Sequence, residues 1–443
     1  MSLPRAGTRF ACTLLLAGMS AAALAQSADS WQARQAEASR LYGNIVRDAD
    51  QHKGLLARYQ LMRAAYAGNR DPAFHQLFDQ YLSWYQTFLG DYPGASATFS
   101  IRQAQLPQDS PPPLPGSGYT ARPALEAIPE LARNYRAVFL NEAHNVPLTR
   151  TLTVQLLASL RAEGFDYFAA ETLSQTDIGL QARGYPVEGS GFYTEEPIYA
   201  DMVRTALKLG FKVIAYEATS DATGDAREAE QADNLYRQVF QKDPHARLVV
   251  NAGYEHIRES GTFLGGASMA EHLRKLTGID PLTIEQTVLF PHRSAGDDHP
   301  TYTAVVQKLR PKVPIVFQDQ AGRPWILRAG YDVSVFFPPQ ALRHGRPTWL
   351  ILGGERKPYF VSGARCVRRY PCLIEARHAD ESPDAIPADR LVLEPKSLSE
   401  LPMTQVHIAE GQPGSDLYLR PGKYRLTYMD ANGHVLARDD IDL

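Results

Sequence analysis

Short apolar runs alternate with helical stretches through the middle of this 443-residue chain, and this alternation constrains the fold more than any other feature. The runs occupy residues 137–140, 167–170, 212–216 and 247–250, and the helical patterns between them occupy 148–163, 198–209 and 226–240. Runs that are apolar at every position are typical of strands buried on both faces of a parallel sheet. The sequence therefore predicts an α/β domain over residues 119–350, with a mostly parallel sheet flanked by helices. Later runs at 282–289 and 313–317 are expected to extend this sheet.

The pattern differs on either side of this domain. Residues 26–106 place apolar and aromatic side chains at helical spacing, which predicts a helical region whose aromatic stripe forms a core rather than a ligand surface. Residues 107–118 are rich in proline and predict a linker. Residues 351–443 carry short alternating segments and the turn pair Asn432-Gly433, so we expect a small all-β domain there.

The first 25 residues resemble a cleavable signal peptide. Arg5 and Arg9 precede an apolar stretch, and Ala23-Leu24-Ala25 gives the small-x-small pattern at which such peptides are cut. No apolar run is long enough for a membrane-spanning helix. We therefore expect a periplasmic or secreted protein that does not span a membrane.

The net charge and the cysteine content further limit the kinds of partner and site that we expect for this protein. The formal net charge is −3 and no long basic stripe is present, which excludes nucleic acid as an expected partner. Cleavage of the signal peptide would remove Cys12 and leave Cys366 and Cys372, six positions apart. In an oxidising compartment this spacing predicts a structural disulfide rather than a zinc or redox pair.

Polar side chains follow each of the four apolar runs. The residues after the runs are Asn141-Glu142-Ala143-His144, Glu171, Glu217, and Asn251-Ala252-Gly253-Tyr254-Glu255-His256. Ligands of open α/β sheets collect at the carboxyl ends of the strands, so we expect these side chains to share one site. Imidazoles and carboxylates suit either a divalent metal that activates water or metal-free acid–base catalysis by histidine.

The order of these motifs resembles the erythromycin-esterase, ChaN, TraB and Tiki superfamily. Its members carry a Gly-Glu-x-His type motif after the first strand, an acidic residue after the second, and a Gly-x-x-His motif further on. Gly253-Tyr-Glu-His256 matches the last of these, whereas Asn141 stands where the first motif usually has glycine. Asparagine tolerates positive φ better than most residues, which would preserve such a turn. The resemblance covers about residues 135–290.

The resemblance implies several roles for these residues. His144 would be a general base or metal ligand, Glu142 and Glu171 orienting or ligating carboxylates, and His256 a second ligand or acid. A divalent metal (Mn, Co or Zn) would be held by His144, Glu171, His256 and Glu217. Arg227 stands where such proteins often place an arginine that pairs with a site carboxylate or an anionic substrate.

Three functions are compatible with this resemblance, because the superfamily includes esterases, metal-dependent proteases and a haem-binding uptake protein. The leading hypothesis is an exported hydrolase of the esterase or peptidase type, acting on a small molecule or a peptide. The first alternative is a binding protein that holds haem or a metal for iron uptake, with Tyr254, Tyr216 or His292 available to haem. The second is a scaffold that has lost catalysis, which the departure at Asn141 leaves open.

Competing motifs favour structural roles. Ser268 approaches a nucleophile elbow, but Glu271 three positions later indicates a helix cap instead. His292, with Asp297, Asp298 and His299, forms a polar cluster that we interpret as a solvated loop. No nucleotide-binding glycine motif occurs, so no nucleotide cofactor is expected.

Overall fold

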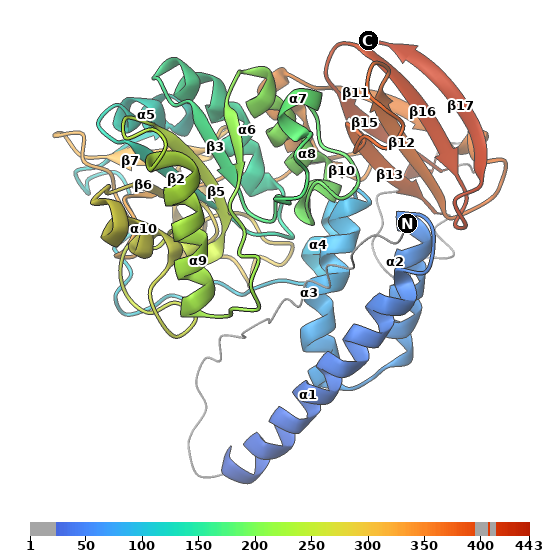
Figure 1. Cartoon of the computed structure of the whole chain (residues 1–443), viewed down its shortest axis with the longest axis horizontal. Helices are drawn as coiled ribbons and strands as arrows, with labels where there is room; N and C mark the ends of the chain where they lie inside the picture. The colour runs from blue at the N-terminus through green and yellow to red at the C-terminus, as the bar shows by residue number, and fades with distance from the viewer. Residues whose placement is uncertain (1–23, 395–405, 408–412) are drawn as a thin grey trace.

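A computed structural model describes residues 24–394, 406–407 and 413–443 of the chain. Nearly all of the predicted signal peptide, Cys12 included, lies outside the described residues. The protein is an α/β protein with an N-terminal helical region and antiparallel β-sheets near the C-terminus, as the sequence predicts (Figure 1). Within the described residues, no helix combines the length and apolar character that a membrane crossing requires.

Helices make up the N-terminal part of the chain and surround the central sheet. The α-helices are α1 (Leu24–Ala49), α2 (Leu55–Gly68), α3 (Pro72–Phe88), α4 (Tyr92–Thr98), α5 (Ala124–Ala132), α6 (Leu148–Ala162), α7 (Leu180–Arg183), α8 (Pro197–Lys208), α9 (Asp225–Leu235), α10 (Met269–Thr277) and α11 (Pro300–Leu309). Short helical turns are η1 (Tyr193–Glu195), η2 (Tyr236–Phe240), η3 (Tyr254–Ile257), η4 (Thr348–Gly354) and η5 (Gly363–Cys366).

The helical region is held by its aromatic side chains. Helix α3 begins where Asp71 accepts a hydrogen bond from the Ala73 backbone and Pro72 occupies the first turn. The predicted aromatic stripe is a core, since Tyr59, Phe74, Phe78, Tyr81 and Phe88 are all buried. The carboxyl-terminal half of α3 is buried throughout, and Figure 1 places α3 and α4 below the junction of the α/β domain and the C-terminal sheets.

A parallel sheet of six strands forms the centre, in the order β4-β3-β5-β2-β6-β8. Its strands are β2 (Ala137–Glu142), β3 (Tyr167–Ala170), β4 (Lys212–Ala215), β5 (Leu248–Gly253), β6 (Leu282–Glu285) and β8 (Val333–Ser334). Successive residues of one strand enter separate cores, with Val138 and Leu140 on one face and Ala137 and Phe139 on the other. Strands β2, β3 and β5 therefore begin with unbroken apolar runs, at residues 137–140, 167–170 and 248–250, because both of their faces are covered.

One strand prediction is wrong. The run at 313–317 does not extend the sheet, because β7 (Ile315–Gln318) pairs antiparallel with β1 (Thr120–Pro123) in a separate two-stranded sheet. Strand β8 takes the edge position beside β6 instead. Residues of this apolar run are buried in a smaller separate core around Trp325 and Phe336. An apolar run predicts a buried strand, but it does not predict which strand pairs with it.

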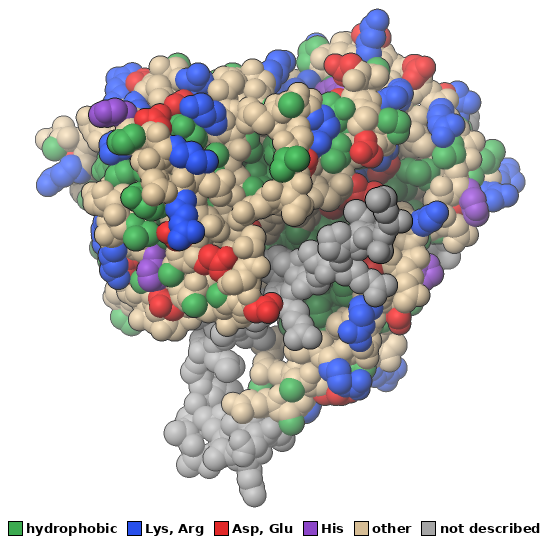
Figure 2. Space-filling view, viewed as in Figure 1, with side chains coloured by type: hydrophobic (Ala, Val, Ile, Leu, Met, Phe, Trp, Pro, Cys, Tyr) green, Lys and Arg blue, Asp and Glu red, His purple; other side chains and the backbone are tan. Residues whose placement is uncertain are grey.

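The C-terminal part contains two antiparallel sheets, ordered β11-β15-β14 and β13-β12-β16-β17. The strands from β9 onward are β9 (Leu342–Arg343), β10 (Arg346–Pro347), β11 (Lys357–Ser362), β12 (Cys372–His378), β13 (Asp389–Leu393), β14 (Val406–His407), β15 (Pro413–Leu419), β16 (Lys423–Met429) and β17 (Val435–Asp442). Cys366 and Cys372 form the predicted disulfide. The hairpin from β16 to β17 turns at Gly433, whose φ is 78°. On the face shown in Figure 2, acidic and basic side chains are interspersed.

Candidate active site

The carboxyl ends of β2, β3 and β5 bring the predicted histidines and carboxylates together. We define the histidine–glutamate site as Glu142, His144, Glu171, Glu228 and His256. All five are buried, and the side chains of His144 and His256 are only 7% and 8% exposed. Strands β2 and β3 lie on either side of β5, so the residues at their carboxyl ends meet at one edge of the sheet, as expected.

His144 is fixed by Glu142. The Nδ1 atom of His144 lies 3.0 Å from Glu142 Oε1. Burial opposes ionisation of Glu142, but the charge of Arg150 and the hydrogen bonds from His144 and Arg150 outweigh it and hold the pKa of this carboxyl well below its usual range. An ionised carboxylate can only accept, so His144 Nδ1 carries a proton, and in the neutral form of the ring it is Nε2 that presents the lone pair.

Two further residues hold Glu142 in place. Arg150, on α6, donates to both carboxylate oxygens at 2.7 and 2.8 Å, and Asn251 donates to Oε2 at 2.6 Å. The same guanidinium donates to Glu196 Oε2 at 3.0 Å. Arg150 is fully buried, and its charge is neutralised by the two carboxylates. Sequence reasoning missed Arg150, Glu196 and Glu228. The available signal for Arg150 was an arginine within the largely apolar helical stretch 148–163.

His256 is fixed in the same way by a different carboxylate. Its Nδ1 atom lies 2.8 Å from Glu228 Oε2, which also accepts from the Met269 backbone at 2.9 Å. Burial lowers the pKa of His256, but the charges of Glu228 and Glu171 outweigh this effect and raise it. Protonation of His256, which places a proton on each ring nitrogen, is therefore favoured over protonation of a free imidazole.

Glu171 lies between the two imidazoles. Its Oε1 is 3.5 Å from His256 Nε2, and its Oε2 is 4.0 Å from His144 Nε2. The Gly253 backbone donates to Oε2 at 2.6 Å. Burial opposes ionisation, but the charges of His256, His144 and Arg227 together lower the pKa of Glu171 to about 2. Glu171 is thus a fixed negative charge that faces both Nε2 atoms.

Arg227 links Glu171 to the end of β4. Its Nη2 lies 3.2 Å from Glu171 Oε1 and 2.8 Å from Glu217 Oε1, and its Nη1 is 3.7 Å from Glu228 Oε1. Arg227 therefore contacts three carboxylates, those of Glu171, Glu217 and Glu228, where the sequence predicted a pairing with one site carboxylate. Its guanidinium is already surrounded by carboxylates, so it supports Glu171 rather than offering an open anion site.

Gly253 is required by the ring of His144. A Cβ atom on Gly253 would lie 2.2 Å from His144 Cε1 and 2.3 Å from Nε2, far inside contact distance. The next residue, Tyr254, has a φ of 42°, which turns the chain directly from β5 into η3 and carries His256 toward the site. Gly253, the glycine of the Gly-x-x-His motif, thus makes room for His144, and the last residue of the same motif is His256.

Asn141 has a different role from the one expected. It lies within β2 and is absent from the positive-φ residues of the described chain, so preservation of a left-handed turn is not its function. Its Nδ2 donates to the Tyr254 carbonyl at 2.9 Å, and its Oδ1 accepts from the Gln286 backbone at 2.6 Å. Asn141 therefore ties β2 to η3 and to the end of β6.

Aromatic rings enclose His144. Tyr193 stacks on it with ring centroids 4.2 Å apart, and Tyr254 meets it edge-on at 5.1 Å. Trp84 reaches it from α3 at 6.1 Å. The helical region therefore contributes to the wall of the site, a contact that the aromatic spacing in the sequence did not reveal.

The donor set as it stands fits a divalent metal poorly. No group of three or more His, Cys, Asp or Glu side chains in the described ranges is arranged to hold a metal ion. Both oxygens of Glu171 already accept hydrogen bonds, one of them from the guanidinium of Arg227, whose positive charge opposes the approach of a dication. Glu217, the fourth predicted ligand, directs Oε1 to Arg227 as well.

Other candidate residues lie apart from this chemistry. Tyr216 is fully buried, so it is not the surface ligand that haem would need. Ser268 caps α10 by accepting from the Glu271 backbone, as predicted. The expected solvated loop is exposed at residues 293–296, whereas the polar side chains around them are paired: His292 pairs with Asp298 at 3.1 Å, and the buried His299 caps α11.

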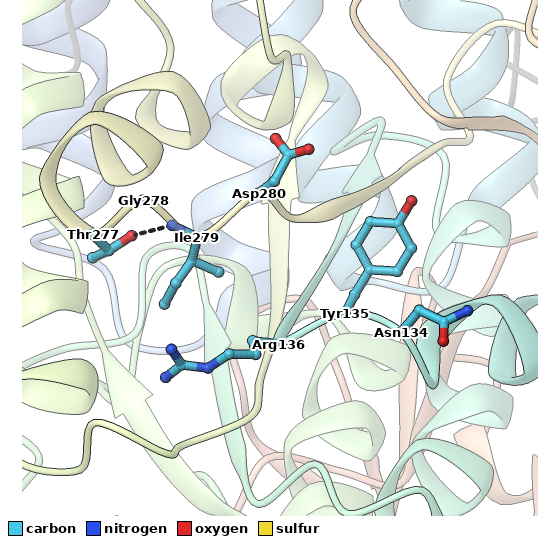
Figure 3. Close-up of a pocket in the computed structure, with 7 residues that line it drawn as sticks. All are labelled: Asn134, Tyr135, Arg136, Thr277, Gly278, Ile279 and Asp280. Carbon is cyan, nitrogen blue, oxygen red and sulfur yellow. Dashed lines mark hydrogen bonds between the residues drawn. The ribbon is translucent and has the colours of Figure 1, made fainter.

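A cavity of about 350 Å³ lies at the opposite end of the sheet (Figure 3). It is lined by residues that precede β2 and β6, among them Tyr135, Arg136 and Asp280. Because strands β2 and β6 are parallel, this cavity and the histidine–glutamate site are at opposite strand ends. The cavity is therefore too remote to hold a substrate for the two histidines.

Comparisons with known proteins give no family. No family model matches the chain, and no curated protein matches it. Among solved structures, the type III effector HopBA1 is 14% identical, with a TM-score of 0.29 over 42% of this chain and 96% of that one. RRSP, a MARTX toxin effector domain from Vibrio vulnificus, is 14% identical, with a TM-score of 0.28 over 54% of this chain and 52% of that one. At these TM-scores the likeness constrains neither fold nor function.

Proposed function

We propose that this protein is an exported hydrolase of the esterase or peptidase type, which activates water with His144 and uses no metal in the step. One observation carries the proposal: two buried histidines are each fixed through Nδ1 by their own carboxylate, with both Nε2 atoms facing Glu171. With His144 neutral, this arrangement leaves its Nε2 with a free lone pair, and it favours protonation of His256. Such a pair supplies both a general base and a general acid.

His144 acts as the base in this proposal. Its Nε2 accepts a proton from a water molecule as the oxygen of that water adds to the substrate carbonyl carbon. The imidazolium that forms is stabilised by Glu142 at Nδ1 and by Glu171 near Nε2. Arg150 and Asn251 keep Glu142 oriented, so they are positioning residues rather than catalytic ones.

His256 acts as the acid. Its Nε2 proton passes to the leaving oxygen or nitrogen as the bond between that atom and the carbonyl carbon breaks. The products are a carboxylic acid and an alcohol or amine, and one proton has moved from His256 to the leaving group while His144 has gained one. Proton exchange with solvent returns both imidazoles to their starting states.

Membership in the erythromycin-esterase, ChaN, TraB and Tiki superfamily is part of this proposal. It is supported by the order of the motifs at the strand ends and by the fit of Gly253 against His144. Export is supported by the predicted signal peptide and by the Cys366–Cys372 disulfide, which suits an oxidising compartment. No contact in the described residues specifically favours the haem-binding or the degenerate-scaffold alternative.

Hydrolysis assays on the mature protein test the proposal. Activated esters and a peptide library are incubated with the wild type, His144→Ala, His256→Ala and the control His245→Ala, an exposed histidine outside the site. We expect both site variants to lose at least about 100-fold in turnover, the control to keep full activity, and a chelator to change nothing. Unchanged hydrolysis in both site variants would refute the proposal, and so would stoichiometric haem binding without turnover.

A further inference from the structure

The proposed active site carries more negative than positive charge. The carboxylates that are linked to one another through shared arginines are all glutamates, namely Glu142, Glu171, Glu196, Glu217 and Glu228. Within the described ranges, the guanidinium groups that contact them are those of Arg150 and Arg227. Five carboxylates therefore surround two guanidinium groups. A buried site with uncompensated negative charge favours a positively charged ligand.

Glu217 presents an acceptor that the protein does not use. Its Oε1 takes hydrogen bonds from Arg227, from Gln231 at 2.8 Å and from the Ala218 backbone at 3.0 Å. Its Oε2 has no hydrogen-bond partner in the described part of the chain, although the side chain is only 14% exposed. A carboxylate with one crowded and one empty oxygen is complementary to an added N–H donor.

Gln231 supplies a second acceptor beside it. This residue is fully buried, and its amide nitrogen donates to Glu217 Oε1, which fixes the orientation of the carboxamide. The carbonyl oxygen of Gln231 is left without a hydrogen-bond partner among the described residues. Buried polar atoms are normally paired, so two unused acceptors on side chains that contact each other indicate a place for a donor-rich group.

This place is next to the reacting groups. A single nitrogen of Arg227 bridges Glu217 Oε1 at 2.8 Å and Glu171 Oε1 at 3.2 Å, and Glu171 faces both histidines. The guanidinium group of Arg227 therefore connects Glu217 directly to Glu171, which faces the histidine that activates water in the proposed mechanism. An anionic substrate group would face the same carboxylates, and Arg227 is already shared among three of them.

We infer that the substrate carries a primary ammonium or guanidinium group beside the bond that is hydrolysed, and that Glu217 Oε2 and the Gln231 carbonyl receive it. This inference rests on the proposed function and specifies its substrate class. It makes Glu217 a specificity-determining residue, whose partner Arg227 also positions Glu171.

A pair of isosteric esters tests the inference. The p-nitrophenyl esters of N-acetyl-lysine and N-acetyl-norleucine differ in charge but hardly in shape, and the readout is the ratio of their kcat/KM values. We expect the wild type to favour the lysine ester by about tenfold or more, and Glu217→Gln to reduce that ratio by about tenfold. The ratio separates charge recognition from general damage, because misplacement of Arg227 would slow both esters together. Glu163→Gln, which removes a charge outside the site, should leave both rates and their ratio unchanged.

The outcomes distinguish this inference from the function on which it rests. Hydrolysis of both esters with a wild-type ratio near one would overturn the inference and leave the hydrolase proposal standing. A lysine preference that survives in Glu217→Gln would also overturn it. No turnover of either ester by the wild type would overturn both.

Discussion

Replacement of Gly253 by alanine tests whether the ring of His144 is held where the proposed chemistry needs it. The backbone at Gly253 has φ −74° and ψ 144°, which alanine adopts without strain. The added methyl carbon would lie 2.2 Å from His144 Cε1 and 3.0 Å from Glu171 Oε2. Any effect of the substitution must therefore act through these two side chains and not through the backbone.

The expected magnitude follows from these distances. Carbon atoms in contact are normally about 3.5–4.0 Å apart, so the imidazole must move by more than about 1 Å. Overpacking of this kind lowers the free energy of unfolding by about 1–3 kcal/mol. A displacement of about 1 Å at a reacting group costs about 100-fold in rate. We expect Gly253→Ala to show both effects.

A double-mutant cycle measured by urea unfolding, with ester turnover for the single variant, isolates the contact. In the His144→Ala background the ring is gone, and only the milder approach to Glu171 remains, so Gly253→Ala should cost less than about 1 kcal/mol there. Gly296→Ala is the control for the glycine-to-alanine change itself, because Gly296 also lies outside the helices and its Cβ would meet its nearest neighbour at an ordinary 3.5 Å. An equal loss of stability in both backgrounds, or full activity in Gly253→Ala, would refute the reasoning.

Four further outcomes are expected. Arg150→Met leaves two buried carboxylates without their cation and should lower the free energy of unfolding by about 3–5 kcal/mol in urea titrations; a loss below about 1 kcal/mol would contradict this. Because the pKa of His256 is raised in the folded state, its contribution to the free energy of unfolding is complete below the ordinary pKa of 6.5 and is lost as pH rises through the folded-state pKa. The free energy of unfolding should then fall by up to about 1.4 kcal/mol per pH unit, and His256→Gln should abolish this slope in unfolding curves measured against pH. The pKa of Glu171, lowered from 4.5 to about 2, means that its stabilisation is present above pH 4.5 and is lost as pH falls toward 2, and identical acid unfolding of the wild type and Glu171→Gln would argue against it. The double variant Cys366→Ser/Cys372→Ser should lose about 2 kcal/mol of stability and keep its ester turnover, because the bridge closes a short loop away from the site.

Sequence reasoning located the site because one topological rule was enough. Parallel strands buried on both faces are recognisable as unbroken apolar runs, and their carboxyl ends meet at one edge. That rule brings His144 and Glu171 together, and the turn at Tyr254 then carries His256 toward them. The same rule could not place the run at 313–317, since an apolar strand in a satellite core has the same appearance as one in the main sheet.

The supporting residues could not be predicted because their partners are distant in the chain. Asn141 bonds to residues 113 and 145 positions away, and without those partners its side chain suggested only tolerance of a turn. Glu228 follows Arg227 on a polar helix and resembles an ordinary solvent-facing carboxylate until α10 packs over it. Helical periodicity reports which face of a helix is apolar, but it does not report which buried carboxylate will meet a histidine.

The proposed base depends on the helical region as much as on the sheet. Tyr92, at the start of α4, donates to Glu196 at 2.9 Å, and Glu196 also caps α8 through two backbone amides. Arg150 then joins Glu196 to Glu142, which holds Nδ1 of His144. The composition change near residue 106 marks a change in secondary structure, whereas the polar chain from Tyr92 to His144 crosses it without a break. Since the tautomer of His144 is set by the last carboxylate in that chain, the geometry of the base is determined jointly by α4, α6 and α8, and the helical region is part of the proposed catalytic unit rather than an appended module.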